Sequence, residues 1–396
     1  MWKLFCYEIK KNVLKLPLLF LLIGLAAVNL YKIRETVRYE GLYGYSIIMK
    51  GEESTFQKME SAFYGEINSE LIEKIQTYSD KMSAIIADGN YDTENASDEF
   101  YTGYAFGDNN VIGEIKEAVR EAYMYPNSIA ELKQRADVCI DFFSGKNKYE
   151  VRKNELLKTL YNGRKINVYG GYEAVELYFN YEFSSFVIMI IMIFVFSASF
   201  SNEMLTGTDK IIKSSGRAGN IFVAKHFTMY AFAAALTIFF SLTDILYFGR
   251  FYGLGFFEQP LYAIPEYRFS PYNITIFGAI ALSCLFKTLA LIFVGEVIML
   301  ISSLTKNPGA AMTMCFAAIG ALIFANGYIP EFASPFTLFS TEKMLREFKC
   351  LNIFGYPVPE FIVMILLTLI YTAVLHIICY RKTAHKIRIK KEADAV

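Results

Sequence analysis

The sequence predicts an all-α polytopic membrane protein with six transmembrane helices and a mainly helical extracytoplasmic domain. Hydrophobic residues make up 54% of the 396-residue chain, and the mean hydropathy of +0.30 is higher than soluble domains usually show. Charged residues, 20% of the chain, gather between the apolar runs. Because the formal net charge is zero, overall charge gives no reason to expect a nucleic-acid partner.

Six apolar runs are long enough to cross a bilayer. A hydrocarbon core of about 30 Å requires roughly 20 helical residues. The runs cover residues 13–31, 183–202, 222–248, 274–303, 309–328 and 359–380. Tyr31 and Lys32 follow the first run where a signal peptide would have small residues at a cleavage site, so we expect this helix to be retained.

Basic residues next to these runs predict the orientation. Three groups would lie on one side of a six-helix protein, and they comprise Lys3, Lys10, Lys11 and Lys15; Lys210, Lys213, Arg217 and Lys225; and Arg381, Lys382, Lys386, Arg388, Lys390 and Lys391. Because cytoplasmic flanks are enriched in lysine and arginine, both termini are expected in the cytoplasm. The chain then divides into residues 1–31 with the first helix, an extracytoplasmic domain at 32–181, and residues 182–396 with the other five helices, a cytoplasmic loop at 203–222 and a basic tail.

The extracytoplasmic domain is predicted to be helical. Apolar residues recur at steps of three and four from Phe56 to Ile85, which is typical of a long amphipathic helix. Similar patterns predict helices at about 111–124, 127–143 and 148–161, whereas alternation typical of strands is weak. The loops at 249–273 and 329–358 are rich in proline and aromatic residues, so we expect broken or re-entrant segments there.

Two features of this domain leave alternatives open. Asp88, Asn90, Asp92 and Glu99 have the spacing of ligands in an EF-hand-like calcium loop, but Thr93 occupies the glycine position, which favours a solvated acidic loop. Cys139 and Cys350 would both lie outside the cell, either as two separate thiols or as a disulfide. The cysteines lack C-x-x-C spacing, so no metal site is expected from them.

The segment from Phe200 to Lys225 combines apolar and charged residues in a regular pattern. Four apolar residues repeat at an interval of seven and predict one amphipathic helix from Glu203 to Lys213; they are Met204, Leu205, Ile211 and Ile212. Serine and glycine residues from Ser214 to Gly219 are expected to end it. Such a helix suits a membrane surface or the groove of a partner protein.

Three segments resemble the ABC type-2 transporter permease family. The first cytoplasmic loop of that family resembles the pattern formed here by Glu203, Gly207, Thr208, Ser214, Arg217 and Lys225, although Gly216 stands where the family often has proline. The N-terminal WKLFCYEIKKNVLK is similar to the in-plane elbow of the family, with Glu8, Lys10 and Lys11 at its acidic and basic positions. The segment with Ser334, Pro335, Phe336 and Leu338 resembles the short re-entrant segment before the last helix.

This resemblance implies the membrane subunit of an ATP-driven exporter in a bacterial plasma membrane. A separate ABC ATPase subunit would bind ATP and press on the coupling loop, whose site residues are Glu203, Gly207, Thr208, Arg217 and Lys225. A second permease subunit would complete a homodimer or heterodimer. This chain contains no G-x-x-x-x-G-K-[ST] motif, so we expect neither a cofactor nor enzymatic activity on it. Peptides, lipids and amphipathic drugs remain open as substrates.

Charged residues within the apolar runs are further candidates. Lys287 and Glu296 are nine residues apart in one predicted helix and should face opposite sides, each with its own partner. They could serve the transport pathway or the subunit interface, but a structural ion pair or a snorkelling lysine would also account for them. Asp244 is expected near the membrane interface. His226 and His376 each lie alone near a membrane boundary with no partner in sequence, so packing or interface roles are expected rather than a proton relay.

Two other functional classes compete with transport. A membrane sensor or immunity protein that binds an extracellular ligand through the outer domain is the main alternative. A membrane hydrolase is disfavoured because the chain has no H-E-x-x-H motif and only three histidines.

Overall fold

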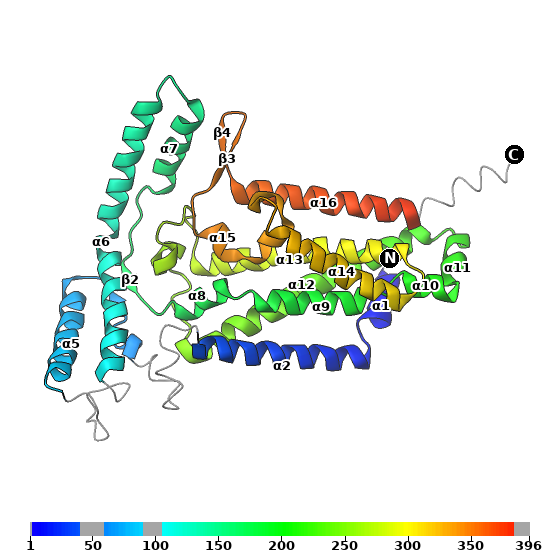
Figure 1. Ribbon diagram of the computed structural model, residues 1–396, viewed down its shortest axis with the longest axis horizontal. Coiled ribbons are helices and arrows are strands. Elements are labelled where there is room, and N and C mark those ends of the chain that lie inside the picture. Colours follow the sequence, from blue (N-terminus) through cyan, green and yellow to red (C-terminus); the bar gives the residue numbers. More distant parts are fainter. Residues whose placement is uncertain (1, 40–58, 90–104, 384–396) are drawn as a thin grey trace.

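The computed structural model describes residues 2–39, 59–89 and 105–383. Long apolar helices run side by side in a bundle, and a second group of helices projects from one end of it (Figure 1). Six helices in the described residues are long and apolar enough to cross a membrane, which confirms the predicted number. They are α2 (Leu16–Tyr39), α9 (Phe183–Phe196) continuing into α10 (Ser201–Thr206), α12 (Ala218–Tyr252), α13 (Ile276–Leu304), α14 (Pro308–Asn326) and α16 (Glu360–Thr383).

The inner helices of the bundle are α9 and α13, whose apolar segments are mostly buried, whereas only a small share of the apolar segments of α2, α14 and α16 is buried. Gly295 allows a close approach of α13 to α12, because a Cβ atom there would lie 2.3 Å from the Met229 sulfur. Asn307 caps α14 by accepting hydrogen bonds from two backbone N–H groups. The bundle therefore has an apolar core and a largely apolar outer surface, as a bilayer-embedded protein requires.

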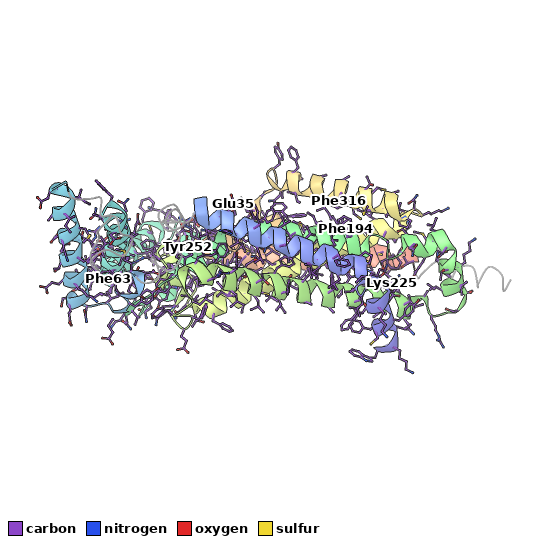
Figure 2. All side chains as sticks on the ribbon, turned by 90° about the horizontal axis from the view of Figure 1, so that it is seen from below. Glu35, Phe63, Phe194, Lys225, Tyr252 and Phe316 are labelled. Atoms are coloured by element: carbon purple, nitrogen blue, oxygen red, sulfur yellow. The ribbon has the colours of Figure 1, made fainter. Side chains whose placement is uncertain are left out.

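One end of the bundle brings together segments from the whole chain. The N-terminal helix α1 (Trp2–Asn12), the short helices α10 and α11 (Thr208–Ser214) and the C-terminal end of α16 all lie there (Figure 1). Lys225 lies at this end, far from Phe63, which lies in a turn at the other end of the molecule (Figure 2).

The opposite end carries a peripheral domain, defined here by α5 (Ser69–Ala87), α6 (Ala105–Phe143), α7 (Lys148–Leu160) and α8 (Glu173–Asn180). It is mainly helical, but strand β1 (Gly65–Glu66) pairs antiparallel with β2 (Val168–Tyr169). A turn and β1 interrupt the helix predicted from Phe56 to Ile85, so α5 begins only at Ser69. Of the calcium-like loop, only Asp88 lies within the described residues.

Helix α6 replaces two predicted helices, because it continues through Pro126 for 39 residues. Proline lacks the N–H that a helix interior uses, and it normally breaks or kinks a helix. Ala122, Tyr125 and Ile129 are buried on both sides of the proline. Continuous packing of this face offsets the lost backbone hydrogen bond.

Irregular loops of the bundle connect it to the peripheral domain. They contain the 3-10 segments Leu261–Ala263, Pro265–Tyr267, Glu331–Ala333 and Pro335–Phe339, the helix α15 (Thr341–Leu345), and a hairpin of β3 (Cys350–Ile353) and β4 (Tyr356–Pro359). The buried Arg164 donates hydrogen bonds to the carbonyls of Ser270 (2.6 Å) and Pro271 (2.7 Å). Cys139 and Cys350 are both free thiols, so the structure contains no disulfide between them.

Candidate functional site

The loop between α9 and α12 forms two short helices, whereas the sequence predicted one helix from Glu203 to Lys213. Gly207 separates α10 from α11 and adopts φ = 71°, in the left-handed region that favours glycine. The heptad spacing therefore does not produce one apolar stripe. Met204 and Ile212 turn toward the bundle and line a small hollow, while Leu205 and Ile211 are 61% and 68% exposed.

Two of the predicted loop residues meet in a buried ion cluster, defined here as Glu8, Lys11, Glu203 and Lys225. The Lys225 Nζ lies 2.9 Å from Glu203 Oε1 and 3.8 Å from Glu8 Oε2. The Lys11 Nζ donates a hydrogen bond of 2.5 Å to the same Oε1 of Glu203. The cluster therefore joins α1, α10 and α12 although Lys11 and Glu203 are 192 residues apart.

The charges of this cluster balance each other, with two lysines opposite two glutamates. The Lys225 side chain is fully buried, and it also donates a hydrogen bond of 2.5 Å to the carbonyl of Ser199. Glu8 accepts a hydrogen bond of 2.8 Å from Asn12 in the next turn of α1. A buried charge is strongly unfavourable unless it is paired and hydrogen-bonded, and here each charge has such a partner.

Lys11 lies outside the apolar helices at the edge of the cluster. Burial alone would lower the pKa of its amino group, but the hydrogen bond from Lys11 to Glu203 and the negative charges of Glu203 and Glu8 outweigh burial, so its pKa is raised. Lys11 therefore remains positively charged and holds α1 against the loop.

The other predicted loop residues occupy the surface. Thr208 and Arg217 are exposed, and the hydroxyls of Thr206 and Thr208 lie 2.8 Å apart across the Gly207 turn. The structure thus unites Glu203 with Lys225 but leaves Thr208 and Arg217 outside the cluster. Sequence reasoning places Glu8 and Lys11 in the N-terminal elbow but does not predict their part in the ion cluster. The one sequence signal for it is an acidic residue, Glu8, within the basic amphipathic N-terminal segment.

A hollow of about 150 Å³ lies next to the cluster, between the loop and the C-terminal end of α16. Its lining combines apolar and charged side chains, including Phe200, Met204, Ile212, Phe222, Asp209 and Lys382. Asp209 and Lys213, two of the charged lining residues, form an ion pair of 2.9 Å along α11. The hollow and the exposed Leu205 and Ile211 give this end of the bundle an amphipathic surface.

Lys287 and Glu296 have different partners in the structure. The buried Lys287 amino group lies 4.8 Å from the centre of the Tyr178 ring. Glu296 is fully buried beside His226 and His376. The expectation that these histidines are isolated is therefore wrong, because three separate helices bring them to one carboxylate.

Asp244 is predicted near the membrane interface, and the structure shows how its side chain is packed. It is fully buried, and its Oδ1 accepts a hydrogen bond of 2.6 Å from Asn29 in α2. Tyr181 donates a hydrogen bond of 3.0 Å to the same Asn29 side chain. Helix packing places Asp244 in the interior, which the position of a residue within an apolar run does not reveal.

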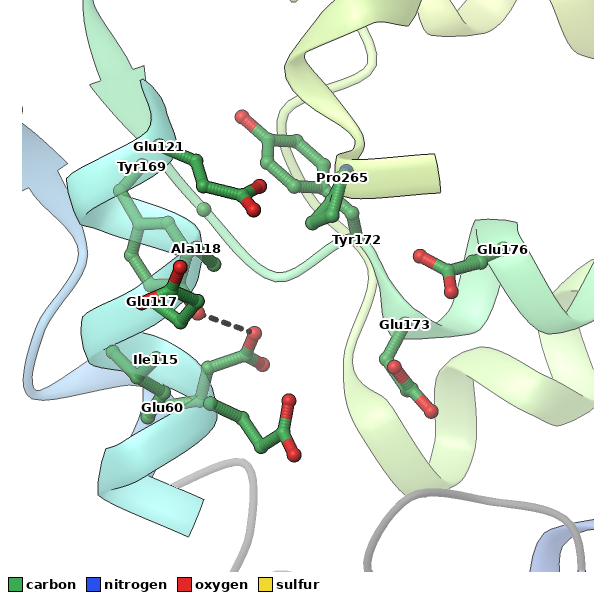
Figure 3. A pocket seen from close by; sticks show the side chains of 12 residues that line it. Glu60, Ile115, Glu117, Ala118, Glu121, Tyr169, Tyr172, Glu173, Glu176 and Pro265 are labelled. Atoms are coloured by element: carbon green, nitrogen blue, oxygen red, sulfur yellow. Dashed lines mark hydrogen bonds between the residues drawn. The ribbon is translucent and has the colours of Figure 1, made fainter. Parts of the chain in front are cut away.

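The peripheral domain contains an acidic cavity of about 270 Å³, which no sequence motif indicated. Glutamates from α6 and α8 face one another across it (Figure 3). The six glutamates in its lining are Glu60, Glu114, Glu117, Glu121, Glu173 and Glu176. Tyr64 and Tyr169 donate hydrogen bonds to the Glu60 carboxylate, at 2.8 and 3.4 Å.

Two of these glutamates have strongly perturbed acidity. Burial raises the pKa of Glu60 to about 8, although the hydrogen bonds from the tyrosines oppose the shift. Burial and the nearby charges of Glu173 and Glu266 raise the pKa of Glu176 to about 9. At neutral pH these two carboxyls therefore hold their protons, and the cavity carries less charge than its composition suggests.

No protein-family model, curated protein or solved structure matches this chain.

Proposed function

We propose that this chain is the permease subunit of an ATP-driven exporter. The observation that carries this proposal is the buried ion cluster, because it connects the α9–α12 loop to both the N-terminal helix and the start of α12. A force applied to α10 and α11 would reach α1 and α12 through Glu203 without a flexible link. Such a rigid connection is what a membrane subunit driven by a separate motor requires.

The arrangement of the ends supports a cytoplasmic position for this loop. The three basic groups flank α1, the α9–α12 loop and the end of α16, which lie together in Figure 1. With six spans this end would face the cytoplasm, and the peripheral domain would lie outside. An ABC ATPase subunit would bind and hydrolyse ATP, and a second permease subunit would complete the pathway.

The surface around the loop supports a docking role for Leu205 and Ile211. Both side chains are largely exposed beside the hollow that Asp209 and Lys213 line. A protein that docks here would bury two aliphatic side chains within a polar rim, the usual composition of an interface. We therefore assign the ATPase contact to α10, α11 and the hollow beside them.

The test is co-expression of the chain with an ABC ATPase subunit proposed as its partner, followed by purification through a tag on the membrane chain. Leu205→Ser combined with Ile211→Ser should weaken the complex at least about tenfold, because burial of two aliphatic side chains is lost. Copurified ATPase and ATP hydrolysis are measured together. Glu203→Gln should leave the complex intact but lower the stimulation of hydrolysis by substrate or lipid.

Phe354→Asn provides the matched control at the opposite end of the molecule. Phe354 is 98% exposed in the β3–β4 turn and has φ = 51°, which asparagine tolerates well. This variant should retain the ATPase. Absence of any copurifying ATPase with the wild-type chain, or equal loss in the control, would overturn the proposal.

The acidic cavity favours a second candidate, a membrane sensor or immunity protein that binds an extracellular ligand. A cavity lined by six glutamates suits a cationic peptide. Binding of a labelled cationic peptide to the chain without ATPase, weakened by Glu173→Gln and unaffected by the Leu205/Ile211 variant, would support this function. Absence of saturable binding at low salt would exclude this role for the cavity.

A further inference from the structure

His226, Glu296 and His376 come from three different helices and meet inside the bundle. The His226 Nε2 lies 3.4 Å from Glu296 Oε2, and the His376 Nδ1 lies 3.0 Å from Glu296 Oε1. One donor atom from each residue falls within 4.8 Å of the other two. Helices α12, α13 and α16 therefore converge on one small polar centre in an apolar core.

Two atoms of this centre lack hydrogen bonds within the described part of the chain. His226 Nε2 and Glu296 Oε2 are buried, face each other, and have no hydrogen-bond partner. The other ring nitrogen, His226 Nδ1, lies 3.0 Å from the backbone carbonyl of Phe222, so Nδ1 carries the proton that forms this bond. With Nδ1 bonded to this carbonyl, Nε2 faces a carboxylate oxygen at 3.4 Å, and a metal ion or a proton on Nε2 would stabilise this arrangement.

The spacing of the donors suits a small metal ion. Zinc binds histidine nitrogen at about 2.0–2.1 Å and carboxylate oxygen at about 2.0–2.2 Å, so donors in a tetrahedral site are roughly 3.4 Å apart. The separations of 3.4 and 3.0 Å, each measured to a different oxygen of Glu296, are close to this value, and the three donor atoms all lie within 4.8 Å of one another. Two imidazoles and one carboxylate select zinc and related transition metals over calcium or magnesium, which prefer oxygen ligands.

Neighbouring groups orient these donors as they do in established metal sites. The Phe222 carbonyl holds the His226 ring in the tautomer that leaves Nε2 free to coordinate. The Tyr230 hydroxyl donates a hydrogen bond to Glu296 Oε1 and lies 3.2 Å from His376 Nδ1. Both contacts come from α12, so one helix supplies a ligand and its supporting groups.

The His376 side chain is 35% exposed, which opens the centre to the surface of the bundle. On another side it is closed by Phe222, whose ring centre lies 4.0 Å from that of His226 and 5.0 Å from that of His376. Phe222 also lines the hollow beside α10 and α11. An ion at this centre would therefore hold α12, α13 and α16 together next to the loop.

We propose that His226, Glu296 and His376 bind one divalent transition-metal ion of the zinc class. The ion would lie between His226 Nε2 and Glu296 Oε2, the two buried atoms without hydrogen bonds among the described residues, and leave a fourth coordination position for water. It ties the last helix to the centre of the bundle. This proposal does not depend on the transport function.

The experiment uses the full chain in detergent, purified without a polyhistidine tag and treated with a chelator. Co²⁺ replaces Zn²⁺ as the probe, because four-coordinate Co²⁺ has a strong visible absorption. We expect saturation at one ion per chain, displacement of Co²⁺ by Zn²⁺, and at least tenfold weaker binding in His376→Gln and Glu296→Gln. His385→Gln is the control, because it removes the remaining histidine of the chain, which lies outside the described residues.

His376→Cys distinguishes the loss of a metal ligand from misfolding of the variant protein. Its side chain is the most exposed of the three, and a thiolate is also a zinc-class ligand, so this variant should still bind Co²⁺ and gain a thiolate charge-transfer band. Absence of saturable Co²⁺ binding in the wild type, or equal binding in Glu296→Gln, would overturn the proposal. The centre would then be a carboxylate paired with a protonated histidine.

Discussion

The buried ion cluster and the acidic cavity both contain buried carboxyl groups, but only the cluster places cations next to them. In the cluster, Glu203 accepts contacts from Lys11 and Lys225 at 2.5 and 2.9 Å, so its negative charge is compensated. In the cavity, the hydrogen-bond donors to Glu60 among the described residues are tyrosine hydroxyls, and burial raises its pKa to about 8. The difference teaches that burial by itself does not decide the charge of a carboxylate. A nearby cation compensates the negative charge, whereas burial without a cation raises the pKa of the carboxyl.

The largest expected effect comes from removal of the cation that balances the cluster. Lys225→Met should lower the free energy of unfolding by about 3 kcal/mol or more, because Glu203 and Glu8 lose the fully buried charge between them. Thermal unfolding in detergent measures this loss. Lys213→Met removes the partly exposed partner of Asp209 and should cost about 1 kcal/mol at most. Equal losses in the two variants would contradict the role assigned to charge compensation.

The cavity should respond to pH in a way that the cluster does not. The Glu60 carboxyl has an ordinary pKa of 4.5 in the unfolded chain and about 8 in the folded protein, so folding favours its protonated form. Its contribution to stability is fully present below pH 4.5 and is lost as pH rises to about 8. Glu60→Gln should therefore raise the unfolding temperature by a few degrees at pH 9 and have a smaller effect at pH 5.

Glu117→Gln is the control for this pH dependence, because it alters the same cavity without a raised pKa. The hydrogen bond from Arg120 lowers the pKa of the exposed Glu117. The stabilising contribution of the Glu117 carboxylate is therefore lost only as pH falls below the ordinary pKa of a glutamate. Glu117→Gln should not change how the unfolding temperature varies with pH between pH 6 and 9. Glu176 has a pKa of about 9, so Glu60→Gln should keep part of the dependence of unfolding temperature on pH. An unchanged slope in Glu60→Gln would show that Glu60 is ionised in the folded protein.

A smaller effect is expected from the backbone that positions Glu203. Gly207→Ala places a Cβ where no atom lies within 4 Å, so its cost is the strain of φ = 71°, about 1 kcal/mol. Gly219→Ala, which also meets open space but lies in helix α12, should instead be neutral or stabilising by up to about 1 kcal/mol. The two unfolding temperatures should therefore move in different directions. The same direction in both would show that the Gly207 turn is not required.

The sequence alone determined the six long apolar helices and the helical nature of the peripheral domain. Both follow from local properties, namely the length of an apolar run and the recurrence of apolar residues at helical steps. It also indicated the break after Ser214, where α11 ends and Gly216 adopts φ = 67°. It did not indicate the continuity of α6 through Pro126, because packing on both sides of the proline outweighs the local preference.

Tertiary structure alone decided which charged groups meet. Glu203 pairs with Lys11 across 192 residues, and Glu296 meets His226 and His376 from two other helices. Helical periodicity places a side chain on a face of its own helix, but the residue opposite depends on how the helices pack and at what height. Small residues such as Gly295 set that packing through close approach. These contacts matter for stability because a charge buried in the apolar interior is unfavourable unless an oppositely charged partner, an ion or a proton compensates it.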